Sequence, residues 1–272
     1  MQFRKKALAK QQSSEELDIP VRLARPQGRL VLLATAAVVA AACFWAVTGT
    51  VSSKLSAAGI LIHAEGSYTL QSPVAGQVVA VSANVGDTLA GGAPLLSVST
   101  GTGSGQKVQT VRTVAAGRLT TLVAKLGTVV QAGSELATVE RVTSPSEPLV
   151  AVLYVSAGSA ATIPAGAAVD LTVQSVPAQQ YGVLRGHVLA VGRVPETQQQ
   201  ISDYLGSGPL AQAFSAQGEP VAVVVQLERS GSTRSGYAWS STQGPPYPVE
   251  STTLVGSAVH LGTQHPIDWL LP

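Results

Sequence analysis

The chain has 272 residues, of which 45% are hydrophobic, 12% charged and 4% aromatic, and its formal net charge is +2. Disordered chains combine low hydrophobicity with high net charge, and nucleic-acid-binding domains are commonly basic, so this composition excludes both classes. A single cysteine excludes an intrachain disulfide and a zinc site built on several cysteines. Abundant glycine with few aromatic residues favours short strands joined by glycine turns, so we expect a mainly β protein.

Charge is concentrated at the N-terminus. Residues 1–29 carry seven Lys or Arg and three Asp or Glu, whereas residues 30–51 carry no charge. A helix over residues 30–51 would be about 33 Å long, enough to cross a hydrocarbon core of about 30 Å. Because positive flanks stay in the cytoplasm, the sequence predicts one transmembrane helix over 30–51, a cytoplasmic segment over 1–29 and an extracytoplasmic remainder on the plasma (inner) membrane. In the first segment, Ser13 and Glu16 have the spacing of a capping box.

Two alternatives to a plain membrane anchor stay open. A cleaved secretory signal normally has a shorter basic region than the 29 residues present here. Residues 40–43, Ala-Ala-Ala-Cys, resemble a lipoprotein processing site in which Ala40 replaces the usual Leu, so lipidation of Cys43 is the second alternative. Both leave the bulk of the chain outside.

The extracytoplasmic part contains an internal repeat. Residues 73–98 and 114–139 match at an offset of 41, with three glycine pairs and six apolar pairs in common. The glycines, expected at turns, are Gly76 with Gly117, Gly86 with Gly127, and Gly92 with Gly133. Between them lie short β-branched runs typical of strands, and glycine allows the positive φ that tight turns need. Neither copy can bury an apolar face alone, so we expect two halves packed face to face as a β-sandwich over 67–140.

Both copies resemble the half-motif of biotinyl/lipoyl hammerhead domains, with the spacing Gly-x9-Gly-x5-Gly and a closing Leu-x-x-Val. With an apolar helix ahead of it, the chain resembles membrane fusion proteins (periplasmic adaptors) of the HlyD type. Its opening, RKKALAKQQSSEELD, and its ending resemble the secretion proteins of NHLM-type bacteriocin systems, whose cargo has nitrile-hydratase-like leader peptides. This resemblance implies a homo-oligomeric adaptor that forms a conduit with an ABC transporter, a peptidase-containing exporter of peptides or bacteriocins.

The chain departs from that family between the two halves. Longer members insert a coiled-coil hairpin there, whereas residues 99–110 form a Gly/Ser-rich connection of about a dozen residues, which we expect to be flexible. Docking to an outer-membrane channel is therefore in doubt. Carrier domains place a modified lysine at the tip of this connection; Lys107 is off-centre and lacks the flanking residues of carriers. A biotin or lipoyl carrier subunit of a membrane-bound enzyme complex is the alternative function.

The resemblance further implies a β-barrel and membrane-proximal region over 52–66 and 141–272. Strands are expected within 149–173, 183–194, 221–227 and 253–261, a turn at 154–166 and a short helix over 197–205, with residues 52–65 pairing with the C-terminal region. Trp239 and Trp269 have two interpretations: core anchors, or part of a surface that meets the transporter.

No motif for catalysis was found. There is no P-loop, nucleophile elbow or dinucleotide fingerprint, and the closest histidines, His260 and His265, lack the i, i+4 spacing of zinc-binding helices. His63 and His187 are isolated in the sequence. The sequence therefore predicts a protein that is not an enzyme, with no catalytic residues, cofactor or metal and no nucleic-acid partner.

Overall fold

The computed structural model describes residues 26–49, 51–101, 105–142, 144 and 147–264. The capping box expected at Ser13 and Glu16, most of the basic segment, His265 and Trp269 lie outside these residues. The chain divides into two units, one of residues 1–51 with 263–272 and the other of residues 52–262.

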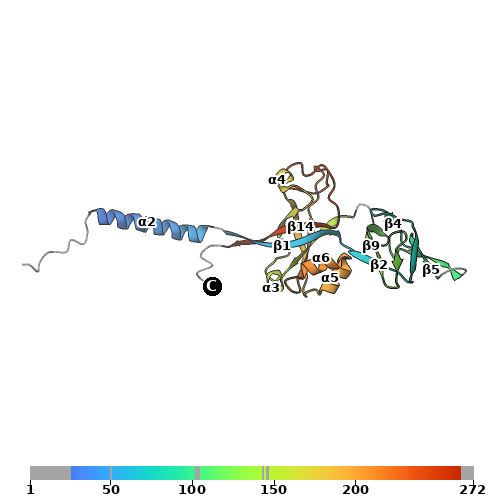
Figure 1. Cartoon of the computed structure of the whole chain (residues 1–272). Coiled ribbons are helices and arrows are strands. Elements are labelled where there is room, and N and C mark those ends of the chain that lie inside the picture. Colours follow the sequence, from blue (N-terminus) through green and yellow to red (C-terminus); the bar gives the residue numbers. More distant parts are fainter. Residues whose placement is uncertain (1–25, 50, 102–104, 143, 145–146, 265–272) are drawn as a thin grey trace, which may run out of the picture. The chain divides into compact units, whose positions relative to one another are not determined.

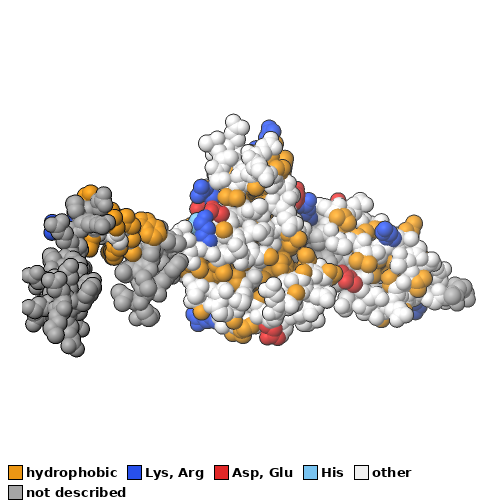
Figure 2. All heavy atoms as spheres, turned by 60° about the vertical axis from the view of Figure 1, so that its left-hand side comes forward, with side chains coloured by type: hydrophobic (Ala, Val, Ile, Leu, Met, Phe, Trp, Pro, Cys, Tyr) orange, Lys and Arg blue, Asp and Glu red, His pale blue; other side chains and the backbone are white. Residues whose placement is uncertain are grey.

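Helix α2, Pro26–Thr48, makes up most of the described part of the first unit. Its segment Gly28–Thr48 is the one helix among the described residues that is long and apolar enough to cross a membrane. The mean hydropathy of this segment is 2.5, and none of its residues is buried. Figure 2 shows hydrophobic side chains on the face of the helix that is turned to the viewer. The helix begins four residues before the predicted 30–51, at Pro26, and proline suits a first helical turn. It ends at Thr48, three residues before the predicted end, and strand β1 begins at Val51.

Six strands of the barrel follow the order β1-β10-β13-β12-β11-β14 and close on themselves (Figure 1). Their bounds are β1 Val51–His63, β10 Leu149–Val155, β11 Ala168–Val173, β12 Leu184–Val191, β13 Val221–Leu227 and β14 Thr253–Gln264. Alternate residues such as Leu153, Leu171 and Val223 fill the interior. The expected pairing of residues 52–65 with the C-terminal region is confirmed by barrel closure between β1 and β14, where Ser257 Oγ donates to the Ala57 carbonyl at 2.9 Å.

Two helices cover the outer face of β1, β10 and β13. The short helix expected over 197–205 is α5, Gln198–Leu205, which Thr197 caps, and α6, Gly208–Phe214, packs beside it. A second core forms beneath them from Ile60, Ile62, Val150, Val152, Ile201 and Leu205. Strand β10 is therefore buried along its whole length, with alternate side chains in the two cores. Single-turn helices α3, Ala157–Ala160, and α4, Ala178–Tyr181, complete the barrel domain.

The remaining eight strands form a sandwich of two four-stranded sheets, β2-β9-β7-β4 and β6-β5-β3-β8. Their bounds are β2 Ser67–Gln71, β3 Gly76–Val81, β4 Thr88–Leu89, β5 Pro94–Thr100, β6 Lys107–Arg112, β7 Gly117–Leu122, β8 Val129–Val130 and β9 Glu135–Arg141. The mainly β prediction, with barrel and sandwich, is confirmed. The halves are not separate sheets, however: β4 of the first copy pairs with β7 of the second, and β8 pairs with β3.

Backbone hydrogen bonds of the sandwich repeat at the offset of 41. Gly86 N–H donates to the Leu119 carbonyl at 2.7 Å, and Gly127 N–H donates to the Val78 carbonyl at 2.8 Å. The glycine turn of each copy is thus hydrogen-bonded to a strand of the other copy.

The connection between the copies differs from the expected flexible stretch. Strand β5 continues to Thr100, β6 starts at Lys107, and these two residues face each other in an antiparallel hairpin. The sequence Lys-Val-Gln-Thr-Val-Arg is rich in the β-branched residues that favour strands, and its Val111 is buried against the sandwich core. The Gly/Ser composition masked this preference, so flexibility was the wrong prediction for residues 99–100 and 107–110.

Candidate functional site

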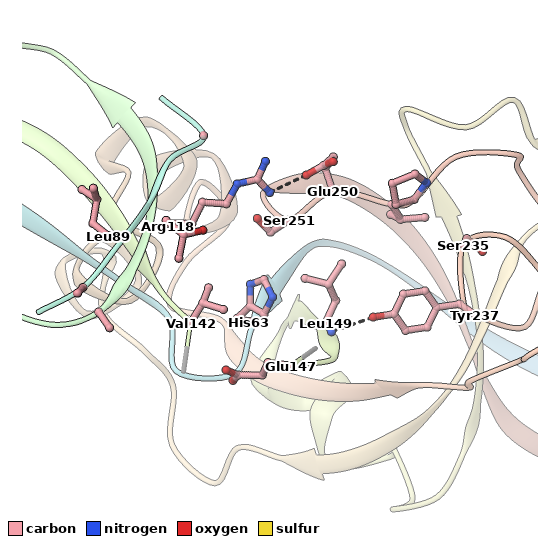
Figure 3. Close-up of a pocket in the computed structure, with 16 residues that line it drawn as sticks. His63, Leu89, Arg118, Val142, Glu147, Leu149, Ser235, Tyr237, Glu250 and Ser251 are labelled. Carbon is pink, nitrogen blue, oxygen red and sulfur yellow. Dashed lines mark hydrogen bonds and ion pairs between the residues drawn. The ribbon is translucent and has the colours of Figure 1, made fainter. Parts of the chain in front are cut away.

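A cleft of about 750 Å³ lies between the sandwich and the barrel within the second unit (Figure 3). The sandwich contributes Leu89 and Arg118, and the barrel domain contributes Leu149, Tyr237 and Glu250. Of the six predicted turn glycines, only Gly86 lines this cleft. The cleft is therefore the place where the domain built from the repeat meets the barrel domain.

Behind two residues that line the cleft, His63 and Ser251, a buried carboxylate connects three segments of the chain. Glu140, near the end of β9, has no exposed surface. Its Oε1 lies 2.9 Å from His63 Nδ1 and accepts the His63 backbone N–H at 3.0 Å, while its Oε2 accepts the Ser251 hydroxyl at 2.5 Å. One carboxylate therefore ties the sandwich to the end of β1 and to the segment preceding β14.

The surroundings of Glu140 stabilise its charged form. Burial alone would raise its pKa, but the bonds from His63 and Ser251 outweigh burial and hold the pKa of this carboxyl below its ordinary value. A buried carboxylate that accepts hydrogen bonds on both oxygens stays charged and held in place. Glu140 therefore connects the sandwich to the barrel domain.

The order of contacts in this cluster is not that of a catalytic triad. In a triad the histidine lies between the serine and the acid, so that it can take the serine proton. Here Glu140 lies between Ser251 and His63, and the Ser251 hydroxyl donates to the carboxylate. The geometry suits fixed attachment of strands, and the described residues show no hydrogen bond between the serine and a histidine.

Two weaker contacts hold the cleft rim, and both are drawn in Figure 3. Arg118 Nη1 lies 2.8 Å from Glu250 Oε2, with the two side chains 39% and 59% exposed. An exposed pair of this kind contributes at most about 1 kcal/mol. The Tyr237 hydroxyl accepts the Leu149 backbone N–H at 3.0 Å.

The predicted turn glycines fall into two physical classes. Gly86, Gly92, Gly127 and Gly133 have φ of 98°, 80°, 85° and 84°, the left-handed region that favours glycine. Gly76 and Gly117 are different: a Cβ there would collide with the carbonyl oxygen of Ser99 or of Glu140 on the facing strand. These two allow close approach of strands, and the others allow turns.

Sequence reasoning missed Glu140, although the repeat held a signal for it. The offset of 41 aligns Glu140 with Ser99, and both occupy buried positions. The two residues directly follow the copies, a serine after the first and a glutamate after the second, near the ends of β5 and β9. The partners of Glu140 come from segments 77 residues before it and 111 residues after it, which no local pattern connects.

The other singled-out residues lie apart from the cleft. Lys107 is exposed on β6, His187 Nε2 is 3.2 Å from Gln226 Oε1, and His260 Nε2 is 2.9 Å from Asp170 Oδ2. Within the described ranges no three His, Cys, Asp or Glu side chains gather in a way that could hold a metal. Trp239 is buried in the barrel core, with Nε1 donating to Ser235 Oγ at 2.9 Å, so the core interpretation holds for it.

No protein-family model matches this sequence, and no curated protein matches it. Among solved structures, ZneB from Cupriavidus metallidurans is 10% identical, with 77% of this chain and 99% of that chain covered and a TM-score of 0.49. MacA from Actinobacillus actinomycetemcomitans is 9% identical, with 80% and 81% covered and a TM-score of 0.49. The membrane fusion protein Spr0693 from Streptococcus pneumoniae R6 is 9% identical, with 73% and 97% covered and a TM-score of 0.40. At these identities and scores the likenesses do not define a family for this chain.

Proposed function

We propose that the protein is a membrane-anchored adaptor, a membrane fusion protein, of an ABC-type export system for peptides or bacteriocins. The observation that carries the proposal is the chain's architecture: a sandwich of tandem lipoyl-like halves is inserted between strands β1 and β10 of a barrel, after an apolar helix. Together with the resemblance of the half-motifs, this order favours an adaptor over an isolated carrier domain.

The membrane attachment is supported by α2. Its hydrophobic side chains are uncovered, including Leu32 at 69% and Trp45 at 61% exposure, and no charged residue follows Arg29 within the helix. The basic segment ahead of it favours a cytoplasmic N-terminus and extracytoplasmic domains. Such a protein meets a transporter in the membrane and at its exit, and the transporter supplies the energy from ATP.

Oligomerisation into a conduit needs contacts between identical copies. The sandwich presents apolar side chains at exposed positions, which such contacts would cover. These residues are Val79, Val85, Val108, Val114, Val123, Leu126 and Val129. Head-to-tail contacts between identical copies close into a ring when their rotation allows it. The short β5–β6 hairpin between the halves favours a short conduit.

A non-catalytic role agrees with the cleft, where Glu140 separates Ser251 from His63. The carrier alternative is disfavoured by Lys107, which pairs with Thr100 in the β5–β6 ladder and is not at the hairpin tip. A swinging prosthetic group needs a lysine at a turn.

Deletion of the gene tests the proposal. The cargo should accumulate inside the cells, while the ATPase activity of the transporter persists. Complementation with the wild-type chain and with Lys107→Arg should both restore export, because an adaptor does not use the lysine amine. Normal export from the deletion strain would contradict the proposal.

Whole-protein mass spectrometry separates the two functions. The adaptor proposal expects no biotinyl or lipoyl mass on Lys107. A modified Lys107, together with loss of function in Lys107→Arg, would establish the carrier alternative.

A further inference from the structure

A second cavity, of about 300 Å³, lies between α5 and the outer face of the barrel. Its walls are Val152 and Tyr154 of β10, Ala222 and Val224 of β13, and Tyr204 of α5. Its volume is at the lower end of the range for small-molecule sites, roughly 300–1,000 Å³. It shares no residue with the cleft between sandwich and barrel.

Tyr154 lines this cavity and carries a buried hydroxyl. The side chain is 7% exposed, and its ring stacks on Phe214 with centroids 4.7 Å apart. The hydroxyl has no hydrogen-bond partner among the described residues. A buried polar group without a partner is costly, so it favours a ligand that can bond to it.

Glu196 supplies a carboxylate at the cavity. Its backbone N–H is bonded to the Pro220 carbonyl at 2.7 Å, but its side chain forms no ion pair with any cation in the described part of the chain. Burial raises the pKa of Glu196. Burial also raises the pKa of Tyr154 and of Tyr204, and the charge of Glu196 raises both further, so the carboxylate lies within electrostatic range of both phenols.

Two other polar groups of the cavity are already engaged. The Tyr204 hydroxyl donates to the Ala64 carbonyl at 3.2 Å, which holds its ring in place. Gln200 Oε1 accepts the Thr197 backbone N–H at 2.8 Å in the capping box of α5. This leaves the Glu196 carboxylate, the Tyr154 hydroxyl, the amide N–H groups of Gln200 and two aromatic rings, set in apolar walls.

We propose that this cavity binds a small organic cation, a primary or secondary amine carried on a short apolar body. The ammonium would pair with Glu196, donate a hydrogen bond to the Tyr154 hydroxyl oxygen, and lie beside the aromatic rings, which attract cations. The apolar body would contact Val152 and Val224. This site goes beyond the adaptor function and does not depend on it.

Calorimetric titration of the full-length chain in lipid nanodiscs tests the site. The probes are 2-phenylethylamine and hexylamine, and the neutral analogues are 2-phenylethanol and 1-hexanol. At least one amine should bind saturably, and its alcohol at least about tenfold more weakly, since a charge-assisted bond is lost. Glu196→Gln should weaken amine binding by a similar factor and leave alcohol binding unchanged.

Two further variants make the test specific. Glu219→Gln removes an exposed carboxylate on the connection before β13 and should leave amine binding unchanged. Tyr154→Phe removes only the hydroxyl and should weaken amine binding several-fold without lowering the melting temperature, because the hydroxyl has no protein partner. The proposal is overturned if neither amine binds saturably, if alcohols bind as tightly, or if folded Glu196→Gln and Tyr154→Phe both bind like the wild type.

Discussion

Gly86 and Gly127 have φ of 98° and 85°, and a Cβ built on either would meet no atom within 4 Å. A side chain at either position would therefore destabilise the fold through backbone strain at positive φ and not through a steric clash. We expect Gly86→Val and Gly127→Val each to lower the free energy of unfolding by about 1–3 kcal/mol. Urea denaturation followed by circular dichroism measures the change.

Gly256 provides a matched control for these substitutions. It lies in β14, is exposed, has open space for a Cβ and does not have positive φ. Gly256→Val should leave stability unchanged or raise it slightly, because valine suits a strand. Equal losses in all three variants would show that the turn conformation is not the cause.

Glu140 predicts a stability that depends on pH. Glu140→Gln removes the anion that His63 and Ser251 surround, and should lower the free energy of unfolding by about 1–3 kcal/mol at pH 7. Because the folded pKa lies below the ordinary 4.5, this contribution is complete above that pH and is lost as pH falls through the folded pKa. The two unfolding curves should therefore converge below about pH 4.5.

Glu250→Gln is the control for this effect. Its carboxylate also connects the two domains, through Arg118, but its side chain is 59% exposed. It should change stability little at any pH. A difference between wild type and Glu140→Gln that stays constant down to pH 3 would contradict the role assigned to the buried anion.

At the scale of elements, α5 depends on its first turn. The Thr197 hydroxyl accepts the Gln200 backbone N–H, and the Gln200 side chain accepts the Thr197 N–H in return. Thr197→Ala should cost about 1 kcal/mol, measured as a shift of the urea midpoint. Gln198→Ala, at an exposed position of the same helix, should have no such cost; a loss of equal size there would point to helix content and not to the cap.

The sequence predicted those elements whose pattern is local. The 41-residue offset indicated the sandwich strands and turns, and the spacing of Ile201 and Leu205 indicated α5. Helix α6 was not predicted, because seven residues that begin with Gly208-Pro209 carry little periodicity. The exchange of β4 and β8 was also missed, since two-residue strands have no pattern that shows which sheet they join.

The candidate site was predicted less well than the fold, for a physical reason. The cleft and the amine cavity are each assembled from segments far apart in the chain, such as Tyr154 with Glu196 or Glu140 with Ser251. Which of these polar side chains become buried depends on barrel closure. Barrel closure depends on contacts between strands far apart in the chain, such as β1 and β14, so a local sequence pattern cannot predict it.

For the whole molecule, we expect one membrane crossing with residues 1–29 inside. Protease added to spheroplasts should digest the part after α2 and spare an N-terminal tag, because the basic segment remains in the cytoplasm. After detergent permeabilisation both parts should be cleaved. Protection of the large C-terminal part in intact spheroplasts, with loss of the N-terminal tag, would reverse the orientation.

The exchange of β4 and β8 bears on how such a molecule could arise. Each copy lends its shortest strand to the sheet of the other, so a solitary copy has an unfilled sheet edge that a second identical molecule could complete. A chain with a single copy would thus need a second chain to complete its sheets. With both copies on one polypeptide the pairing is intramolecular and does not depend on protein concentration. The two copies need not be identical for this, and the residues directly after them, Ser99 and Glu140, differ in charge.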